Sequence, residues 1–156
     1  MMLVPTSKTA EDVAGMEYDW LGCDSKGHVA LFSTAGAGYP PAEFLRDTDA
    51  HELAIRSVLA LAATTGAQFH PPVAPGLANP WRLVAERGLY AYDSDMNGRG
   101  YRLVAAPIVA VTVEALPAEI VRVARDVTCP CDFATQAAVT DETLLSLAGT
   151  RTCGRE

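Results

Sequence analysis

Asp93, Asp95, Asn97 and Gly98 form the pattern D-x-D-x-N-G, which places oxygen-bearing side chains at alternate positions. Calcium prefers such hard oxygen ligands, and the glycine lets the chain turn sharply around the ion. The twelfth position of a calcium loop carries a glutamate that binds through both oxygens, but this chain has Val104 there. Turns rich in Asp, Asn and Gly also form without an ion. We therefore expect a hairpin turn here and no metal.

The four cysteines are a second set of candidate ligands, because thiolates bind zinc well. Only Pro130 separates Cys129 from Cys131, whereas the usual zinc knuckle has two residues between its cysteines. Cys23 and Cys153 complete the set without restoring a zinc-binding spacing. A disulfide or redox role for Cys129 and Cys131 is a second interpretation, and ordinary thiols are a third. We expect no zinc site and no cofactor, and the role of this pair stays open.

Nucleophilic catalysis would require a base beside Cys23, and His28 could lie across a hairpin from it. A working pair also needs a third group to orient the base and donors that stabilise an oxyanion. The sequence indicates neither, and it has no G-x-S-x-G, Walker or dinucleotide-binding pattern. The glycine-containing segment 34–38 follows a strand without opening a clear helix, so it is only a weak candidate for a phosphate-binding loop. We expect His28, His51 and His70 to be surface or hydrogen-bonded core residues, and we favour a role other than catalysis.

Aromatic and acidic side chains in the expected loops could instead bind another protein. Tyrosine and tryptophan are frequent anchors at the centre of protein interfaces, and polar residues surround that centre. A rim of carboxylates would also steer a basic partner into contact. The candidate partner-binding residues are Tyr39, Glu43, Asp47, Trp81, Asp93 and Asp95.

The overall charge is compatible with a basic partner. The chain has 19 acidic and 12 basic residues and a net charge of −7, which disfavours nucleic acid because binding there depends on neutralising phosphates. The apolar segment 57–63 is far too short to cross a bilayer, and the first 15 residues lack the pattern of a signal peptide. Arginine outnumbers lysine and alanine is abundant, as in GC-rich bacterial genomes. We expect a bacterial, cytoplasmic protein with no membrane association.

The clearest structural signal is the segment Met16–Pro41. Apolar and acidic residues alternate as far as Trp20, the polar turn Asp24–Gly27 follows, and His28–Phe32 is a second apolar run. Alternation with period two places side chains on opposite faces of a strand, and a glycine relieves the turn. The pattern predicts a β-hairpin followed by an irregular loop over residues 33–41.

Helical patterns follow this loop. Asp49, with Glu52 three residues later, has the form of a helix start, and apolar residues then recur at helical spacing until Gly66. Four prolines between residues 68 and 80 indicate an irregular connector. A short helix is expected over residues 79–87, because proline is tolerated at the first helical position.

The remaining pattern predicts further strands and helices. They are a second hairpin formed by Leu89–Asp93 and Tyr101–Ala106, strands at Ile108–Leu116 and Thr128–Phe133, helices at Pro117–Arg125 and from Thr140 to Leu147, and a single helical turn at Thr9–Ala14. Strand pairs interleaved with separate helices are typical of α+β proteins. We expect one α+β domain over residues 1–156, with a mostly antiparallel sheet built from hairpins and two to four helices packed on it. Residues 1–15 and 149–156 are expected to be weakly ordered.

The run DWLGCDSKGHVALF, from Asp19 to Phe32, resembles a pattern in small bacterial proteins. There, an aromatic strand, an acidic turn ending in Gly-His-Val and an apolar strand precede a Gly/Pro loop. More loosely, residues 16–41 are similar to the SUKH superfamily of immunity proteins, with further support from Leu89–Asp93 and residues 116–120. The resemblance implies an α+β fold that neutralises a toxin, and it implies no catalytic residues. The helix pair that precedes the first strand in that superfamily is missing or much reduced here.

These observations predict a protein-binding domain that acts as an immunity-type inhibitor of a basic partner such as a toxin. The alternative is a small enzyme or ligand-binding protein whose site lies in the loops 33–41 and 68–80. A deep pocket with two or more convergent titratable groups would favour that alternative. A metal-stabilised structural module is a third interpretation.

Overall fold

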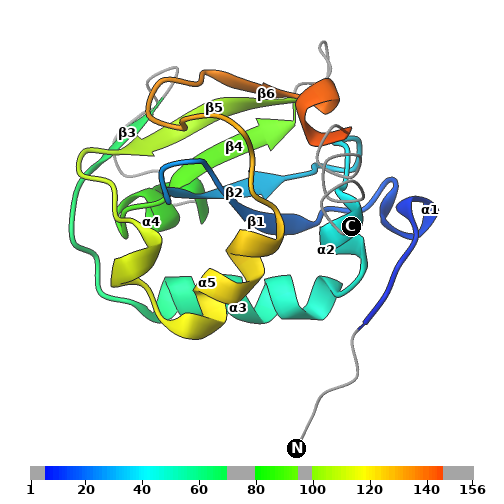
Figure 1. Ribbon diagram of the computed structural model, residues 1–156, viewed down its shortest axis with the longest axis horizontal. Helices are drawn as coiled ribbons and strands as arrows, with labels where there is room; N and C mark the ends of the chain where they lie inside the picture. Colours follow the sequence, from blue (N-terminus) through cyan, green and yellow to red (C-terminus); the bar gives the residue numbers. More distant parts are fainter. Residues whose placement is uncertain (1–5, 70–79, 95–99, 146–156) are drawn as a thin grey trace, which may run out of the picture.

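A computed structural model describes residues 6–69, 80–94 and 100–145, whose strands form one sheet in the order β1-β2-β4-β5-β3 (Figure 1). A further strand, β6, also pairs with β5. On the edge of β5 that faces away from β4, the first residues of β5 pair with β6 and the last residues pair with β3. The strands are β1 (Asp19–Cys23), β2 (Val29–Ser33), β3 (Ala67–Phe69), β4 (Tyr90–Ser94), β5 (Gly100–Pro107) and β6 (Ala138–Thr140).

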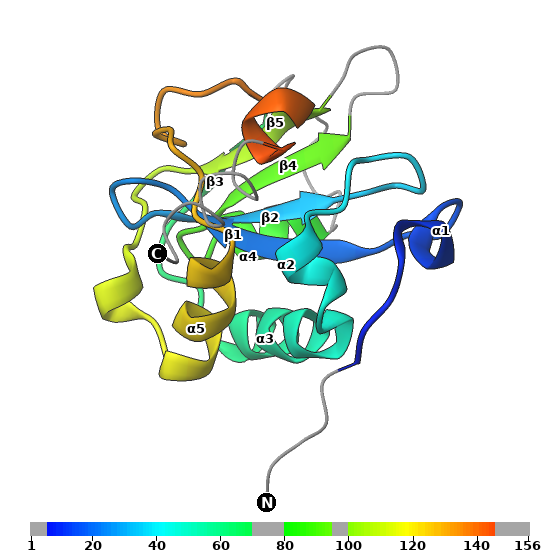
Figure 2. The ribbon, with the colours of Figure 1, turned by 45° about the vertical axis from the view of Figure 1, so that its right-hand side comes forward.

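The longer helices lie on one face of this sheet, where α3 and α5 run side by side below it (Figures 1 and 2). The helices are α1 (Ala10–Val13), α2 (Ala42–Leu45), α3 (Thr48–Ala60), α4 (Pro80–Ala85), the 3₁₀ turn η1 (Val113–Ala115) and α5 (Ala118–Asp126), and residues 141–145 are also helical. The expected α+β domain is confirmed. The described helices exceed the expected two to four because several are single turns.

Both expected hairpins are present, since β1 pairs with β2 and β4 with β5, each antiparallel. At the first turn Gly27 has φ +86°, a left-handed backbone that favours glycine. The exception to the antiparallel arrangement is the parallel pairing of β2 with β4. Parallel neighbours need a long crossover connection, and the segment that carries α2, α3 and α4 supplies it.

Alternation along the strands divides the core into two layers. Leu21 and Leu31 face α3, α4 and α5, whereas Trp20 and Phe32 face the other side of the sheet. There the Trp20 and Phe32 rings stack with their centroids 4.0 Å apart, and Phe133 from the segment that follows α5 packs edge-on against Phe32. The sheet is therefore buried on both faces, one under helices and one under an irregular segment.

Two expected strands are wrong. Ile108–Leu116 contains the turn η1 and a single bridge between Thr112 and His28, because β3 and β6 already occupy the free edge of β5. In Thr128–Phe133 a tight turn at Cys129–Cys131 interrupts the chain, and one bridge to Cys23 remains. Branched apolar residues favour strands, but a strand also needs an open edge to pair with.

Several element boundaries also differ from the expected ones. Helix α3 begins after Asp47 rather than after Asp49, and it ends at Ala60, six residues before Gly66. The expected connector overlaps β3, which pairs with β5; residues 70–79 lie outside the described part. The helical turn before the first hairpin, the helix that begins at Pro80, α5 and the start of the last helix agree with the expectations.

In the described residues no helix combines the length and the apolar character needed to cross a membrane.

Candidate partner-binding groove

A groove of about 880 Å³ lies between α3 and α5, beside α2 and the N-terminal segment. Its apolar surface comes from Ala50, Leu53 and Ala54 on α3 and from Val123 on α5. Leu53 is 51% exposed, whereas Ala54, the next residue of the helix, is buried in the core. Leu53 thus lies outside the buried stripe of α3, and a partner that covered it would remove apolar surface from water.

Carboxylates surround this apolar surface. Among the described residues that line the groove, the acidic ones are Glu43, Asp47, Asp49, Glu119 and Asp126, and the guanidinium is that of Arg122. Charges of one sign that line a cleft reinforce one another, because the low-dielectric walls focus the field. The groove therefore favours a cationic segment over an anionic one.

Two of these carboxylates are held in place by the start of α3. Asp47 caps the helix, since its Oδ1 accepts the backbone N–H of Ala50 at 3.2 Å and that of Thr6 at 3.1 Å. Asp49 Oδ2 accepts the Thr6 hydroxyl at 2.7 Å. Because a helix N-terminus carries a partial positive charge, it also stabilises these anions. This part of the rim is preorganised.

His51 lies at the buried wall of the groove and adds no positive charge to it at neutral pH. Its Nδ1 accepts the backbone N–H of Leu21 at 3.0 Å, and its ring packs edge-on against Phe44. Burial lowers the pKa of His51 to about 4, against a smaller opposing effect of Asp47. His51 is therefore a hydrogen-bonded core histidine that closes the unpaired edge of β1, one of the two roles expected for it.

A second hollow of about 310 Å³ lies against α3 and the start of β1. Its acidic lining residues are Glu17, Asp19, Asp49 and Glu52, with Arg56 as the basic one. Arg56 is engaged by Glu52 at 2.7 Å, one helical turn earlier. The two hollows share Asp49. We call their combined surface the acidic face.

Of the expected partner-binding residues, Glu43 and Asp47 come together in the groove. Tyr39 lies outside its lining but close to Glu43, whose charge adds to burial in raising the pKa of the Tyr39 phenol. The backbone oxygen of Tyr39 accepts the Tyr101 hydroxyl at 2.7 Å, so the Gly/Pro loop is tied to the aromatic layer.

Trp81 and Asp93 lie elsewhere, around Ser33. The Trp81 indole N–H donates to the Ser33 hydroxyl at 3.2 Å, and Asp93 is the neighbour of Ser33 on the adjacent strand. The Asp93 carboxylate also accepts the backbone N–H of Ser94 at 2.9 Å. Asp95 lies outside the described residues. A role of these side chains in binding stays a prediction.

Asp19, Ser33 and Asp93 lie in one row across three neighbouring strands, and the sequence does not predict this row. Burial is the main cause of the raised pKa of both carboxyl groups, and each is raised further by the charge of Glu17. Strand register decides this juxtaposition, and no local pattern indicates it. The groove residue Leu53 could have been found, because it is an apolar residue off the buried stripe of a predicted helix.

Asp24, His28 and Asp132 bring potential metal-ligand atoms within 4.8 Å of one another. The Asp24 carboxylate, however, already accepts the N–H groups of Lys26, His28 and Phe133 at 2.8–2.9 Å, and it pairs with the His28 ring at 2.8 Å. A carboxylate has about four acceptor positions, so this one is saturated. The arrangement fits a hydrogen-bonded junction rather than a metal site.

The expected proximity of Cys23 and His28 does not give a catalytic pair. His28 Nδ1 contacts Asp24, whereas the Cys23 sulfur lies 3.3 Å from the Thr128 hydroxyl. Burial raises the pKa of Cys23, which keeps its thiol protonated. This environment is that of an inert core cysteine.

In comparisons with known proteins, no family model, no curated protein and no solved structure matches this chain.

Proposed function

We propose that this chain is a protein-binding domain that receives a basic segment of its partner in the groove between α3 and α5. The observation that carries the proposal is the exposed Leu53 within a rim of five carboxylates and one guanidinium. An apolar centre supplies affinity by desolvation, while a charged rim accelerates encounter and selects the partner by sign.

The partner in this proposal is a toxin, and the chain is its immunity-type inhibitor in the bacterial cytoplasm. The charge of the groove supports a basic partner, and the loose resemblance of residues 16–41 to SUKH immunity proteins suggests the toxin. The excess of carboxylates in the groove also disfavours nucleic acid as the partner.

Co-expression tests this proposal directly. Each gene beside the one for this chain is expressed in a bacterial host, alone and together with this chain. We expect one product to arrest growth alone, growth to return on co-expression, and the two proteins to co-purify. If growth returned but the two proteins did not form a complex, inhibition by binding would be wrong. If no neighbouring gene product arrested growth, the proposal that the partner is a toxin would be wrong.

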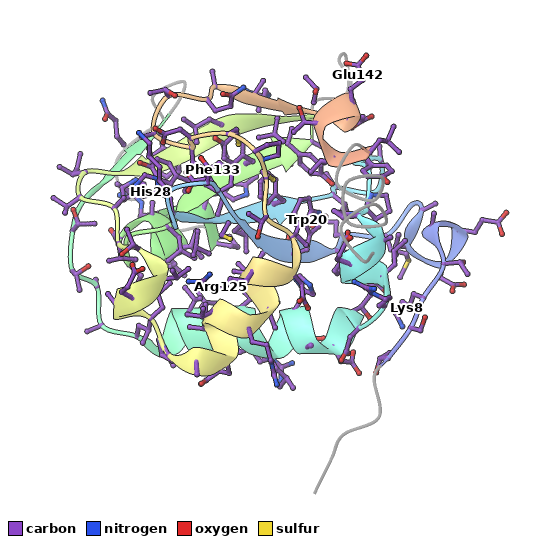
Figure 3. The ribbon with its side chains drawn as sticks, in the orientation of Figure 1. Lys8, Trp20, His28, Arg125, Phe133 and Glu142 are labelled. Carbon is purple, nitrogen blue, oxygen red and sulfur yellow. The ribbon has the colours of Figure 1, made fainter. Side chains whose placement is uncertain are left out.

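Groove variants then test the site. Glu119→Lys and Leu53→Ser are expected to weaken the complex at least about tenfold, because the first reverses a rim charge and the second removes the apolar anchor without changing the charge. Glu142→Lys is the matched control, since it makes the same charge change in a helix at the opposite end of the molecule (Figure 3). If Glu119→Lys and Glu142→Lys weaken binding equally, the effect is one of overall charge and the groove is not the site.

A small-molecule site near residues 33–41 and 68–80 remains the alternative. The observation that favours it is the pair of partly buried carboxyl groups, Asp19 and Asp93, on either side of Ser33. A ligand there would protect the protein against heating, and Asp93→Asn would abolish that protection without weakening the partner complex. A thermal-shift screen of small metabolites measures the first effect, and a screen without any stabilising compound would argue against this function.

A further inference from the structure

Cys129 and Cys131 are held in a tight turn. The backbone N–H of Cys131 donates to the Cys129 oxygen at 2.8 Å, closing a three-residue turn around Pro130. Residues two apart in an extended chain are separated by about 7 Å, and such a turn brings them closer. A disulfide needs Cα atoms about 4.4–6.8 Å apart. The backbone therefore places the two cysteines at a distance that a disulfide can bridge.

The first β-hairpin fixes this turn from both sides. The Cys129 N–H donates to the Cys23 oxygen at 2.7 Å, and the Cys131 oxygen accepts both the backbone N–H and the hydroxyl of Ser25, at 3.0 and 2.9 Å. These bonds anchor the backbone of the turn to the two ends of the segment 23–25.

The two thiols also differ in accessibility. The interaction between them lowers the pKa of Cys131, whereas the same interaction and burial raise the pKa of Cys129. Cys129 is fully buried, whereas Cys131 is half-buried and lines a hollow of about 170 Å³ together with Gln136 and Thr143. The accessible sulfur is thus also the more nucleophilic one at neutral pH.

We infer that Cys129 and Cys131 form a redox-active dithiol that reduces a small disulfide such as oxidised glutathione. The Cys131 thiolate attacks one sulfur of the disulfide, whose S–S bond breaks, and the leaving thiolate takes up the proton that Cys131 had released. Cys129 then loses its proton, attacks the Cys131 sulfur and releases the second thiol, which takes up that proton. The small disulfide is reduced to two thiols, and the protein dithiol is oxidised to a disulfide.

This site is independent of the proposed partner groove, because none of the groove-lining residues belongs to it. The size of the hollow beside Cys131 also limits the substrate. A hollow of about 170 Å³ is below the usual range of about 300–1,000 Å³ for ligand pockets, so it admits one sulfur-bearing arm rather than a folded protein. The chemistry is that of exchange with a low-molecular-weight thiol pool.

Mass spectrometry of the full-length protein tests the inference. The reduced protein is incubated with oxidised glutathione, quenched in acid, alkylated and digested with trypsin. Cys129 and Cys131 share the tryptic peptide of residues 126–151, which contains no other cysteine. We expect that peptide to lose two hydrogen atoms and to resist alkylation. If the peptide stays reduced, or carries glutathione that is never released, the dithiol chemistry is wrong.

Variants separate the roles of the two sulfurs. In Cys129→Ala we expect glutathione to accumulate on Cys131 as a stable mixed disulfide, and alkylation of Cys131 by iodoacetamide at pH 7 to slow several-fold. Cys131→Ala is expected to leave Cys129 unmodified, and Cys23→Ala serves as the control that keeps the reaction. Circular dichroism verifies that each variant is folded. If Cys131 reacts with glutathione and iodoacetamide in the same way in the wild-type protein and in Cys129→Ala, the proposed dithiol is wrong, even if Cys131 itself is reactive.

Discussion

Buried polar side chains satisfy the backbone groups that the sheet leaves unpaired. His51 accepts the N–H of Leu21 on the edge strand β1. Asp24 accepts backbone N–H groups from the first turn and from Phe133 in the segment that covers the aromatic layer. An unpaired buried N–H costs free energy comparable to a lost hydrogen bond. His51 and Asp24 therefore each hold together segments that are far apart in the sequence.

Replacing Asp24 by alanine is expected to destabilise the fold by about 3 kcal/mol or more, because it leaves several buried donors without an acceptor. Urea unfolding followed by circular dichroism measures this loss. Asp132→Ala is the control, since it removes a half-buried carboxylate that pairs with Lys26 at 3.0 Å and leaves the Asp24 acceptor in place. A loss in Asp24→Ala no larger than that of the control would show that the junction contributes little.

His51 predicts a pH dependence of stability. Its pKa in the folded protein is about 4, below the ordinary value of about 6.5, so between these values the unfolded chain binds a proton and the folded chain does not. Stability is complete above about pH 6.5 and falls as the pH decreases to about 4, by about 3 kcal/mol.

His51→Asn keeps an acceptor near Nδ1 and removes the titration. The difference in unfolding free energy between the two proteins, measured in urea from pH 7 to pH 4, should therefore shrink or reverse towards pH 4. A difference that is constant over this range would mean that His51 titrates normally in the fold.

The connections between elements depend on glycines where the chain passes close to another segment. Gly88, between α4 and β4, has φ +94°, and a Cβ atom there would lie 2.7 Å from Val111 Cγ1. The segment that carries Val111 is the one that was expected to be a strand. Its packing over Gly88 helps to explain why it runs irregularly against α4 and β4 instead of extending the sheet.

Gly88→Ala is expected to cost about 2–3 kcal/mol, because a left-handed backbone and a steric overlap act together. Gly15→Ala is the matched control, since Gly15 has φ +78° but no atom within 4 Å of the added Cβ. Gly15→Ala should lower the free energy of unfolding only by the cost of a left-handed backbone at alanine, about 1 kcal/mol. Thermal unfolding of both variants measures the difference, and equal losses would mean that Val111 moves aside freely.

At the scale of the molecule, one sheet is shared by two different layers. Helices α3, α4 and α5 cover one face, and the segment after α5 covers the aromatic face that contains Trp20 (Figure 2). Because β1, β2, β4 and β5 each contribute side chains to both layers, neither layer keeps its packing when these strands separate. The two layers should therefore unfold together.

Trp81→Phe tests this cooperativity by leaving Trp20, in the aromatic layer, as the remaining tryptophan. Far-UV circular dichroism, dominated by the helices, and Trp20 fluorescence are expected to give one coincident urea transition. Separate midpoints would mean that the aromatic layer and the helical layer unfold independently.

The sequence predicts much of the local structure. The two pairs of antiparallel strands, α5 and the helix that begins at Pro80 follow from alternation, glycine position and helical spacing. It does not predict the pairing of β2 with β4, or that residues 108–116 find no strand edge. Pairing depends on which edges other segments already occupy, and this is a property of the whole chain.

The candidate sites divide in the same way. Acidic residues near the start of α3 were predicted as candidates, because Glu43 and Asp47 are visible as charges beside a loop. The groove itself exists only because α5 packs next to α3, so that Glu119 and Leu53 line the same hollow. Likewise, the spacing of Cys129 and Cys131 can be read from the sequence. That Cys129 is more buried than Cys131 depends on the hairpin to which their turn is hydrogen-bonded. Residue types and local spacing determine which chemistry is available, and long-range packing decides which groups meet, because contacts between distant segments leave no local signature.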